Sequence, residues 1–164
     1  MPIIDSQEYH ELALQMIAPD AVLRQPYFHS PLYSWFLAGI YLLFGPQTTA
    51  VRVMQSGLSV LSLLLLYALG VRLFSRPAAR TAAVMWALYG PVIFFHGELT
   101  NVPWILLLNL AGLYALNRAM SAASFGLWLA AGAALGLSAI TRPDVLPFAG
   151  LMVLWLVGQA AAPS

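Results

Sequence analysis

Hydrophobic side chains recur at helical intervals near the start of the chain. Between Asp5 and Ala18 they follow one another at spacings of three and four residues, which is the period of a helix with a single apolar face. Pro19 ends the pattern, because proline lacks the backbone N–H that a continuing helix needs. The segment predicts an amphipathic helix that lies on a surface. The residues of its apolar face are Tyr9, Leu12, Ala13, Met16 and Ile17.

A second apolar segment, Leu32 to Phe44, is too short to cross a lipid bilayer. It follows a proline-containing stretch, residues 20–31, that we interpret as a connecting loop, and Gly45-Pro46 ends it. A membrane-spanning helix needs about 20 apolar residues, and this segment falls well short of that length. We therefore expect a helix that lies in the membrane interface without crossing.

Long apolar runs fill the rest of the chain. The first, residues 49–74, comfortably exceeds the spanning length, and further runs follow after short separators. Short separators make consecutive helices antiparallel neighbours. The pattern predicts an all-α, polytopic transmembrane helix bundle with about five spanning helices plus two juxtamembrane interfacial helices. The later runs are 81–97, 101–117, 125–141 and a weaker one at 145–158.

Composition supports lipid as the solvent and excludes several kinds of chemistry. Of the 164 residues, 61% are hydrophobic and 8% are charged, against about a quarter charged in soluble domains. The sequence has no cysteine and no lysine, which excludes a disulfide, a thiolate metal site, a thiol nucleophile and a Schiff-base lysine. The net charge of +1 lacks the basic excess that nucleic-acid binding requires.

The arginines predict which side of the membrane each turn faces. Arg72, Arg76 and Arg80 cluster in one turn, Arg118 marks the turn two helices later, and neither turn contains an acid. Cytoplasmic loops carry such an excess of basic residues. Counting crossings from these turns puts Glu98, Arg142 and the first 52 residues, with all six acids, on the extracytoplasmic side. This assignment requires that segment 32–44 does not cross.

Four polar residues on that side each allow a structural and a functional interpretation. Asp5 either caps the first helix or acts chemically, and His29 is either a structural hydrogen-bonding group or a metal ligand. Glu98 pairs with an arginine, coordinates a cation or meets lipid headgroups. Arg142 either reaches lipid phosphates from a helix end or grips a substrate phosphate. Motifs for nucleotide binding or for proteases and other hydrolases are absent from the sequence.

The order of several short segments resembles the GT-C membrane glycosyltransferases of the protein O-mannosyltransferase and aminoarabinose-transferase type. Each segment is weak by itself, but their order is specific. The matching segments are Asp5-Ser-Gln-Glu-Tyr9, Tyr27-Phe-His-Ser-Pro-Leu-Tyr33 with Trp35, Leu43-Phe-Gly45, Ala50-Val-Arg52, His96-Gly-Glu98 and Gly136-Leu-Ser-Ala-Ile-Thr-Arg-Pro143.

The resemblance implies transfer of a sugar from a polyprenyl-phosphate-linked donor to a lipid, glycan or protein acceptor. It implies that Asp5 is a catalytic base in an inverting reaction and that Glu98 supplies a second carboxylate. It further implies that Arg142 binds phosphate and that Tyr9 and His29 contact substrate. His29 stands where some relatives hold a metal-ligating acid, so a divalent metal is a possible cofactor.

The sequence departs from the family pattern in identifiable places. The Asp-Glu pair common in the first loop is Asp5-Ser6 here, and the Asp-Pro often found after the third crossing is Val102-Pro103. Ser30 replaces a basic residue that handles the lipid phosphate in relatives. Relatives also have a membrane helix before the catalytic aspartate and several after the last segment here, so we expect an incomplete portion of such an enzyme, inactive alone.

Two domains and a location follow from these assignments. Residues 1–48 are expected to form an extracytoplasmic first loop with amphipathic juxtamembrane helices, and residues 49–164 an incomplete GT-C type bundle. The expected location is the bacterial inner membrane, with the active side extracytoplasmic and membrane lipids as neighbours. The alternative is a non-enzymatic transporter piece or lipid-flipping subunit, which predicts ionisable residues at the bilayer midplane rather than at one rim.

Overall fold

The computed structural model describes residues 4–18, 31–122 and 124–161 of the chain. Within these ranges all regular structure is helical and no strand occurs, which confirms the all-α membrane bundle. The helices are α1 (Ile4–Ile17), α2 (Pro31–Phe44), α3 (Thr48–Leu73), α4 (Arg76–Leu88), α5 (Gly90–Gly97), α6 (Val102–Ala122), α7 (Phe125–Thr141), the short 3₁₀ helix η1 (Pro143–Val145) and α8 (Leu146–Ala161).

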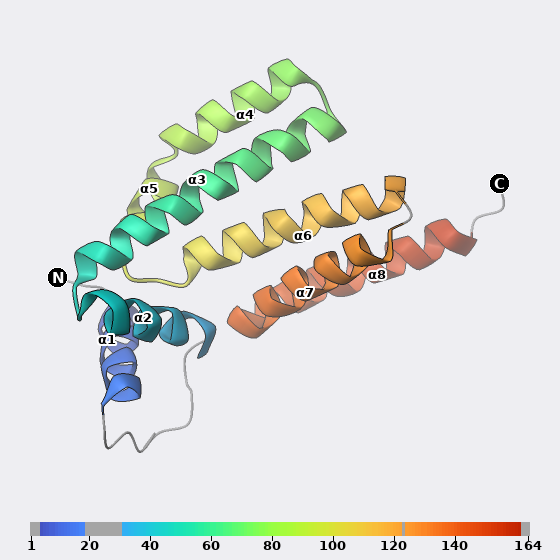
Figure 1. Cartoon of the computed structure of the whole chain (residues 1–164). Coiled ribbons are helices and arrows are strands. Elements are labelled where there is room, and N and C mark those ends of the chain that lie inside the picture. Colours follow the sequence, from blue (N-terminus) through green and yellow to red (C-terminus); the bar gives the residue numbers. More distant parts are fainter. Residues whose placement is uncertain (1–3, 19–30, 123, 162–164) are drawn as a thin grey trace.

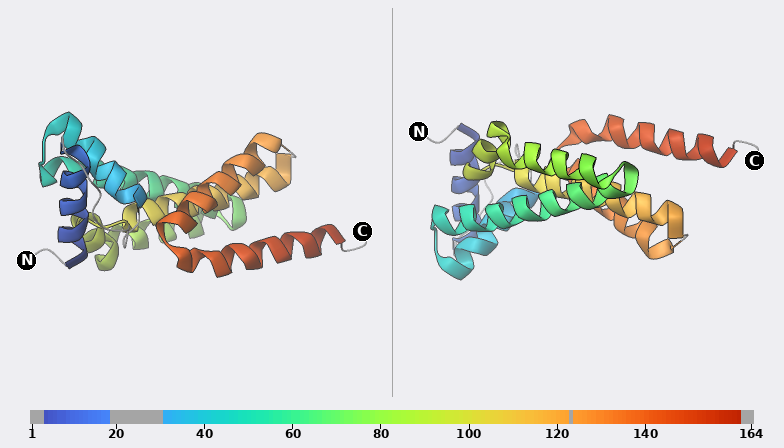
Figure 2. Two further views of the ribbon diagram at one scale, coloured as in Figure 1. Left: turned by 90° about the horizontal axis from the view of Figure 1, so that it is seen from below. Right: turned by 90° about the horizontal axis from the view of Figure 1, so that it is seen from above.

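The longer helices run along one common direction and form the bundle. Helices α3, α4, α6, α7 and α8 follow that direction in Figures 1 and 2, and α3 packs against both α4 and α6 while α6 packs against α7. Helix α1 lies across the end of the bundle at which α3 begins, and α2 packs beside it. The α3–α4 and α6–α7 turns lie at the opposite end. The pairs α3–α4 and α6–α7 are therefore antiparallel neighbours, as the short turns predicted, whereas α7 and α8 follow each other in the chain without packing along each other.

Among the described residues, two helices are long and apolar enough to cross a membrane by themselves. Helix α3 has 26 residues and α6 has 21. The pair α4 and α5 passes the same test only when taken together, and the two are bent by 52° relative to each other. Helices α7 and α8, with 17 and 16 residues, are apolar but shorter than the usual span of about 20. Their crossing, and with it the count of about five spans, stays a prediction.

The expected span over residues 81–97 is not one continuous helix, because the helix breaks at Tyr89. The backbone of Tyr89 is extended, with φ −74° and ψ 107°, and Pro91 lies in the first turn of α5. In a continuous helix Pro91 could not donate to the carbonyl of Ala87, and its ring would clash with that carbonyl. A proline is tolerated in the first turn of a new helix, where its N–H has no helical partner anyway.

The most deeply buried apolar cluster lies between α1, α2 and the start of α3. The rings of Tyr9 and Tyr33 meet edge to face, with centroids 4.7 Å apart. Leu37 and Val51 are completely buried beside them. This packing fixes α1 against the bundle and presents its adjacent, polar face to a pocket described below. The buried members of the cluster are Tyr9, Ala13, Tyr33, Leu37, Ala38, Ile40, Tyr41, Val51 and Leu99.

The close contact between α3 and α4 depends on Gly70. A Cβ atom at Gly70 would lie 3.0 Å from Cβ and 3.2 Å from Cα of Ala79, whereas a Cβ at Gly57 of the same helix would meet nothing within 4 Å. Gly70→Leu is expected to separate the helices and lower the unfolding midpoint by about 2–12 °C, as overpacking costs about 1–3 kcal/mol. Thermal unfolding of the detergent-solubilised protein measures this shift. Gly57→Leu is the matched control, and an equal shift in both variants would contradict a specific contact at Gly70.

Candidate functional site

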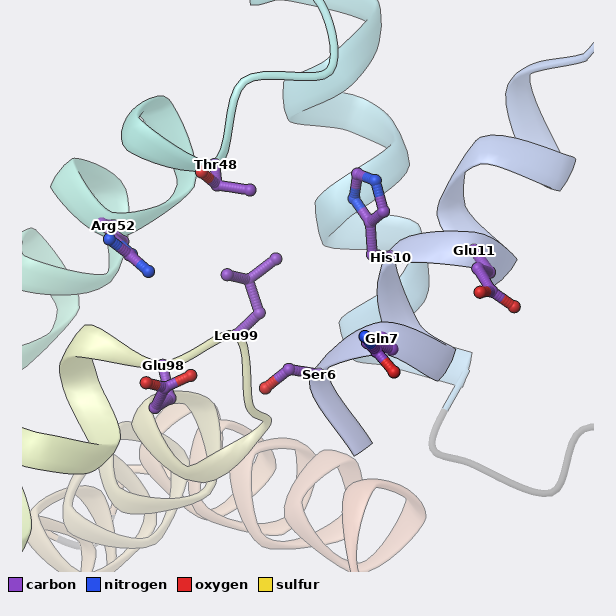
Figure 3. A pocket seen from close by; sticks show the side chains of 8 residues that line it. All are labelled: Ser6, Gln7, His10, Glu11, Thr48, Arg52, Glu98 and Leu99. Atoms are coloured by element: carbon purple, nitrogen blue, oxygen red, sulfur yellow. The ribbon is translucent and has the colours of Figure 1, made fainter. Parts of the chain in front are cut away.

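A pocket of about 500 Å³ lies where α1 crosses the end of the bundle. Its walls come from α1, from the first turns of α3 and from the loop that follows α5 (Figure 3). All of its lining side chains except that of Leu99 are polar or charged. The lining residues are Ser6, Gln7, His10, Glu11, Thr48, Arg52, Glu98 and Leu99.

Helix α1 contributes one polar face to the pocket. Spacings of one, four and five residues from Ser6 bring Gln7, His10 and Glu11 to the same side of a helix. The Ser6 side chain is only 2% exposed, and its hydroxyl has no hydrogen-bond partner. Figure 3 shows this hydroxyl directed toward the side where Glu98 lies. An unpaired buried hydroxyl is costly, so a polar ligand in the pocket would relieve that cost.

Opposite charges face the pocket from two different elements. Arg52 stands in the second turn of α3, and Glu98 caps the C-terminal end of α5 (Figure 3). Within the part of the chain that the structure describes, neither the guanidinium nor the carboxylate makes an ion pair. Glu98 is partly buried and Arg52 is exposed. Both groups are therefore available to a ligand that carries a phosphate and hydroxyl groups.

Gln55 holds the backbone of the loop that carries Glu98. Its side chain is fully buried, and its Nε2 donates to the carbonyl oxygens of Glu98 at 3.1 Å and Thr100 at 3.2 Å. Sequence analysis missed this residue. The available signal was an amide three residues after Arg52, and therefore on the same side of the helix, inside an otherwise apolar span.

Tyrosines of α2 support the α1 wall. Nδ1 of His10 and the hydroxyl of Tyr41 are 2.7 Å apart, so this hydrogen bond fixes the histidine ring at the edge of the pocket. Burial, reinforced by the neighbouring Tyr41 and Tyr9, raises the pKa of Tyr33 well above its usual range. Tyr33 is therefore a neutral phenol beneath the pocket, where it packs rather than exchanging protons.

The structure brings together only some of the residues that the sequence proposed. Glu98 lines the pocket. Asp5 lies in the first turn of α1, so the helix begins before it rather than after it, and its side chain is outside the described residues. Tyr9 belongs to the buried cluster beneath the pocket and does not line it. His29 lies outside the described residues altogether. In the described ranges, no three His, Asp or Glu side chains gather as a metal site.

Arg142 lies apart from this pocket. Its Nε donates to the Asp144 carboxylate at 2.9 Å, and both side chains are more than half exposed. Together they border a second pocket of about 420 Å³ between α6, η1 and α8, which also contains Asn109. The carbonyl oxygen of the Asn109 side chain is buried there without a hydrogen-bond partner. An exposed ion pair of this kind adds little stability, so the guanidinium can exchange Asp144 for another anion.

The comparisons with known proteins identify a family. The model of the family described as dolichyl-phosphate-mannose-protein mannosyltransferase matches residues 28–163, most of the chain. No curated protein and no solved structure matches. The match covers α2 to α8 and the noted segments from Leu43 onward, whereas the segment from Asp5 to Tyr9 lies outside it. The chain therefore belongs to the dolichyl-phosphate-mannose-protein mannosyltransferase family, and so to the membrane glycosyltransferases of the GT-C type.

Proposed function

We propose that this protein contributes to transfer of a sugar from a polyprenyl-phosphate-linked donor to an acceptor on the extracytoplasmic side of the membrane. The observation that carries the proposal is the pocket in which the side chains of Arg52 and Glu98 and the buried hydroxyl of Ser6 all lack partners within the described residues. A cation beside a carboxylate and a hydroxyl suits a sugar phosphate, whose phosphate and hydroxyl groups need complementary partners.

The proposed reaction is a single displacement at the anomeric carbon. Asp5 accepts the proton of the acceptor nucleophile as that nucleophile bonds to the anomeric carbon. The bond from this carbon to the phosphate oxygen breaks at the same time, and the polyprenyl phosphate leaves with the electron pair. Attack from the face opposite the leaving group inverts the configuration. Arg52 lines the pocket together with Glu98 and is the first proposed phosphate contact, and Arg142 is the second at this end of the bundle.

A donor-choice assay tests the proposal. Membranes that contain the protein as part of its complete enzyme are incubated with a radiolabelled sugar on a polyprenyl phosphate, or with the same sugar on a nucleotide, and label in the acceptor fraction is measured. We expect transfer from the lipid-linked donor only, above that of membranes lacking the protein. Transfer from the nucleotide sugar alone would overturn the proposed donor. Equal signals in both membrane samples would remove the activity.

A labelling experiment tests the proposed sidedness in the cysteine-free background. Gln47 lies in the exposed turn between α2 and α3, and Ser121 is exposed near the α6–α7 turn at the opposite end. In intact cells, a membrane-impermeant thiol reagent should modify Gln47→Cys and spare Ser121→Cys, while both react after permeabilisation. The reverse pattern would place the pocket in the cytoplasm.

Gln55 is a positioning residue in this proposal, acting through the backbone of Glu98. Gln55→Met keeps the side-chain length but leaves two carbonyl oxygens unpaired, each at a cost of about 1–3 kcal/mol, so the loop should shift and transfer should fall about tenfold. The measurement is kcat of the variant alone and combined with Glu98→Gln. The combined loss should be clearly smaller than the product of the single losses, because both changes act on one group.

The control for this change is Ser62→Ala. Ser62 is also fully buried in α3, but its hydroxyl donates only to the carbonyl of Leu58 in its own helix. Transfer by this variant should match that of the unaltered protein. Independent, fully multiplicative losses from Gln55→Met and Glu98→Gln would show that Gln55 supports the fold without positioning Glu98.

A further inference from the structure

The end of the bundle opposite the pocket carries positive charge without compensating acids. The α3–α4 and α6–α7 turns lie together at this end (Figures 1 and 2). Between Leu99 and Pro143, and between Asp20 and Glu98, the sequence contains no acidic residue, so both turns are purely basic. The arginines of this end are Arg72, Arg76, Arg80 and Arg118.

Arg72 differs from the other arginines of this end because its side chain is held in place. Its Nε donates to the side-chain oxygen of Asn117 at 2.8 Å, which joins α3 to α6. No other hydrogen bond or ion pair engages its guanidinium within the described residues, so both terminal nitrogens can donate to a ligand. A guanidinium fixed in this way loses less freedom on binding an anion than a mobile side chain does.

An apolar pocket of about 160 Å³ opens beside this hydrogen bond, between α3, α6 and α8. Asn117 is its one strongly polar lining residue and is also the partner of Arg72. Several lining side chains remain partly exposed on the lipid-facing surface, Trp155 among them at 49%. The lining residues are Leu69, Leu73, Leu113, Leu116, Asn117, Met120, Met152 and Trp155.

We propose that Arg72, Asn117 and this apolar pocket form a binding site for one anionic phospholipid. The guanidinium of Arg72, held by Asn117, would bind the lipid phosphate. An acyl chain would enter the pocket beside Leu73 and Trp155. Basic groups at the mouth of an apolar pocket between membrane helices match an amphiphile that is negative at one end and apolar at the other. The site is separate from the proposed transfer reaction and does not depend on it.

Fluorescence quenching tests this site with defined lipids. The full chain is placed in phosphatidylcholine vesicles that contain a minor fraction of a brominated lipid. This lipid is either phosphatidylglycerol or phosphatidylcholine, each with brominated acyl chains. The Trp155 signal is the difference between the unaltered protein and Trp155→Phe. Contact with the bulk bilayer quenches the Trp155 fluorescence equally for both lipids. Stronger quenching by brominated phosphatidylglycerol therefore reports local enrichment of that lipid. We expect an enrichment of about fivefold.

Matched variants locate the enrichment. Arg72→Gln and Asn117→Leu should each abolish it, while Arg80→Gln, at the same end but outside the pocket and the hydrogen bond, should retain it. Equal loss in Arg80→Gln and Arg72→Gln would overturn the site in favour of diffuse charge attraction, as would equal quenching by both brominated lipids. Arg72→Lys keeps the charge but loses the planar donor pair, so it should retain only part of the enrichment. A circular dichroism spectrum checks that each variant is folded.

Discussion

Replacing Glu98 by glutamine is expected to lower sugar transfer by about a hundredfold to a thousandfold, the range for loss of a positioned charged group at a reacting centre. The carboxylate faces the pocket beside Arg52 and has no ion-pair partner in the described residues. The substitution keeps the size of the side chain and removes its charge. The fold should survive, because Gln55 bonds the backbone carbonyl of Glu98 and not its carboxylate.

Initial rates with the lipid-linked donor measure this effect, together with the unfolding midpoint of the variant. Glu8→Gln is the matched control, since Glu8 is an exposed acid on α1 outside the pocket lining. Its transfer rate should stay within about twofold, as expected for a surface change of small energy. A Glu98→Gln protein with full activity and an unchanged midpoint would remove Glu98 from the site.

Asp5→Asn is expected to have the largest effect and to lower sugar transfer by more than about a thousandfold, because asparagine cannot accept the proton. The basis is the resemblance of the Asp5 segment to the family pattern and the position of Asp5 in α1, one residue before Ser6 of the pocket wall. Membrane insertion and thermal unfolding should remain unchanged.

The pH dependence separates the proposed base from a merely structural acid. If Asp5 accepts the proton, kcat of the unaltered protein should fall at acid pH as the carboxylate becomes protonated, and the residual activity of Asp5→Asn should lose this limb. Glu8→Gln again serves as the control and should keep it. If Asp5→Asn keeps the full kcat and the same fall of kcat at acid pH, the base is another residue.

Much of the fold follows from local pattern. Helices α3 and α6 could be predicted from the sequence because each is a long apolar run between polar turns. The break between α4 and α5 was not predicted, since hydropathy stays high through Tyr89. Gly90-Pro91 was the local signal that a continuous helix would lose a hydrogen bond there.

The site was less predictable, because its parts come from distant segments. Glu98 stood out as the acid at the end of an apolar span. Gln55 acquires its role only through contact with a loop more than forty residues later, and His10 only through Tyr41 on another helix. Arg52 lay within a family-like segment, but nothing in the sequence indicated that it would face Glu98. Such pairings arise from helix packing, which hydropathy patterns do not encode.

The spacing of two arginines along α3 matches the thickness of the hydrocarbon core of a membrane. The helix has arginines at positions 52 and 72, and the rise of about 1.5 Å per residue separates them by about 30 Å, the thickness of a bilayer's hydrocarbon core. One rigid helix can therefore hold Arg52 at the headgroup level of one leaflet and Arg72 at that of the other. In the proposed reaction, a polyprenyl phosphate whose charge lies at the same depth as Arg52 would bring its sugar to the acceptor without entering the hydrocarbon.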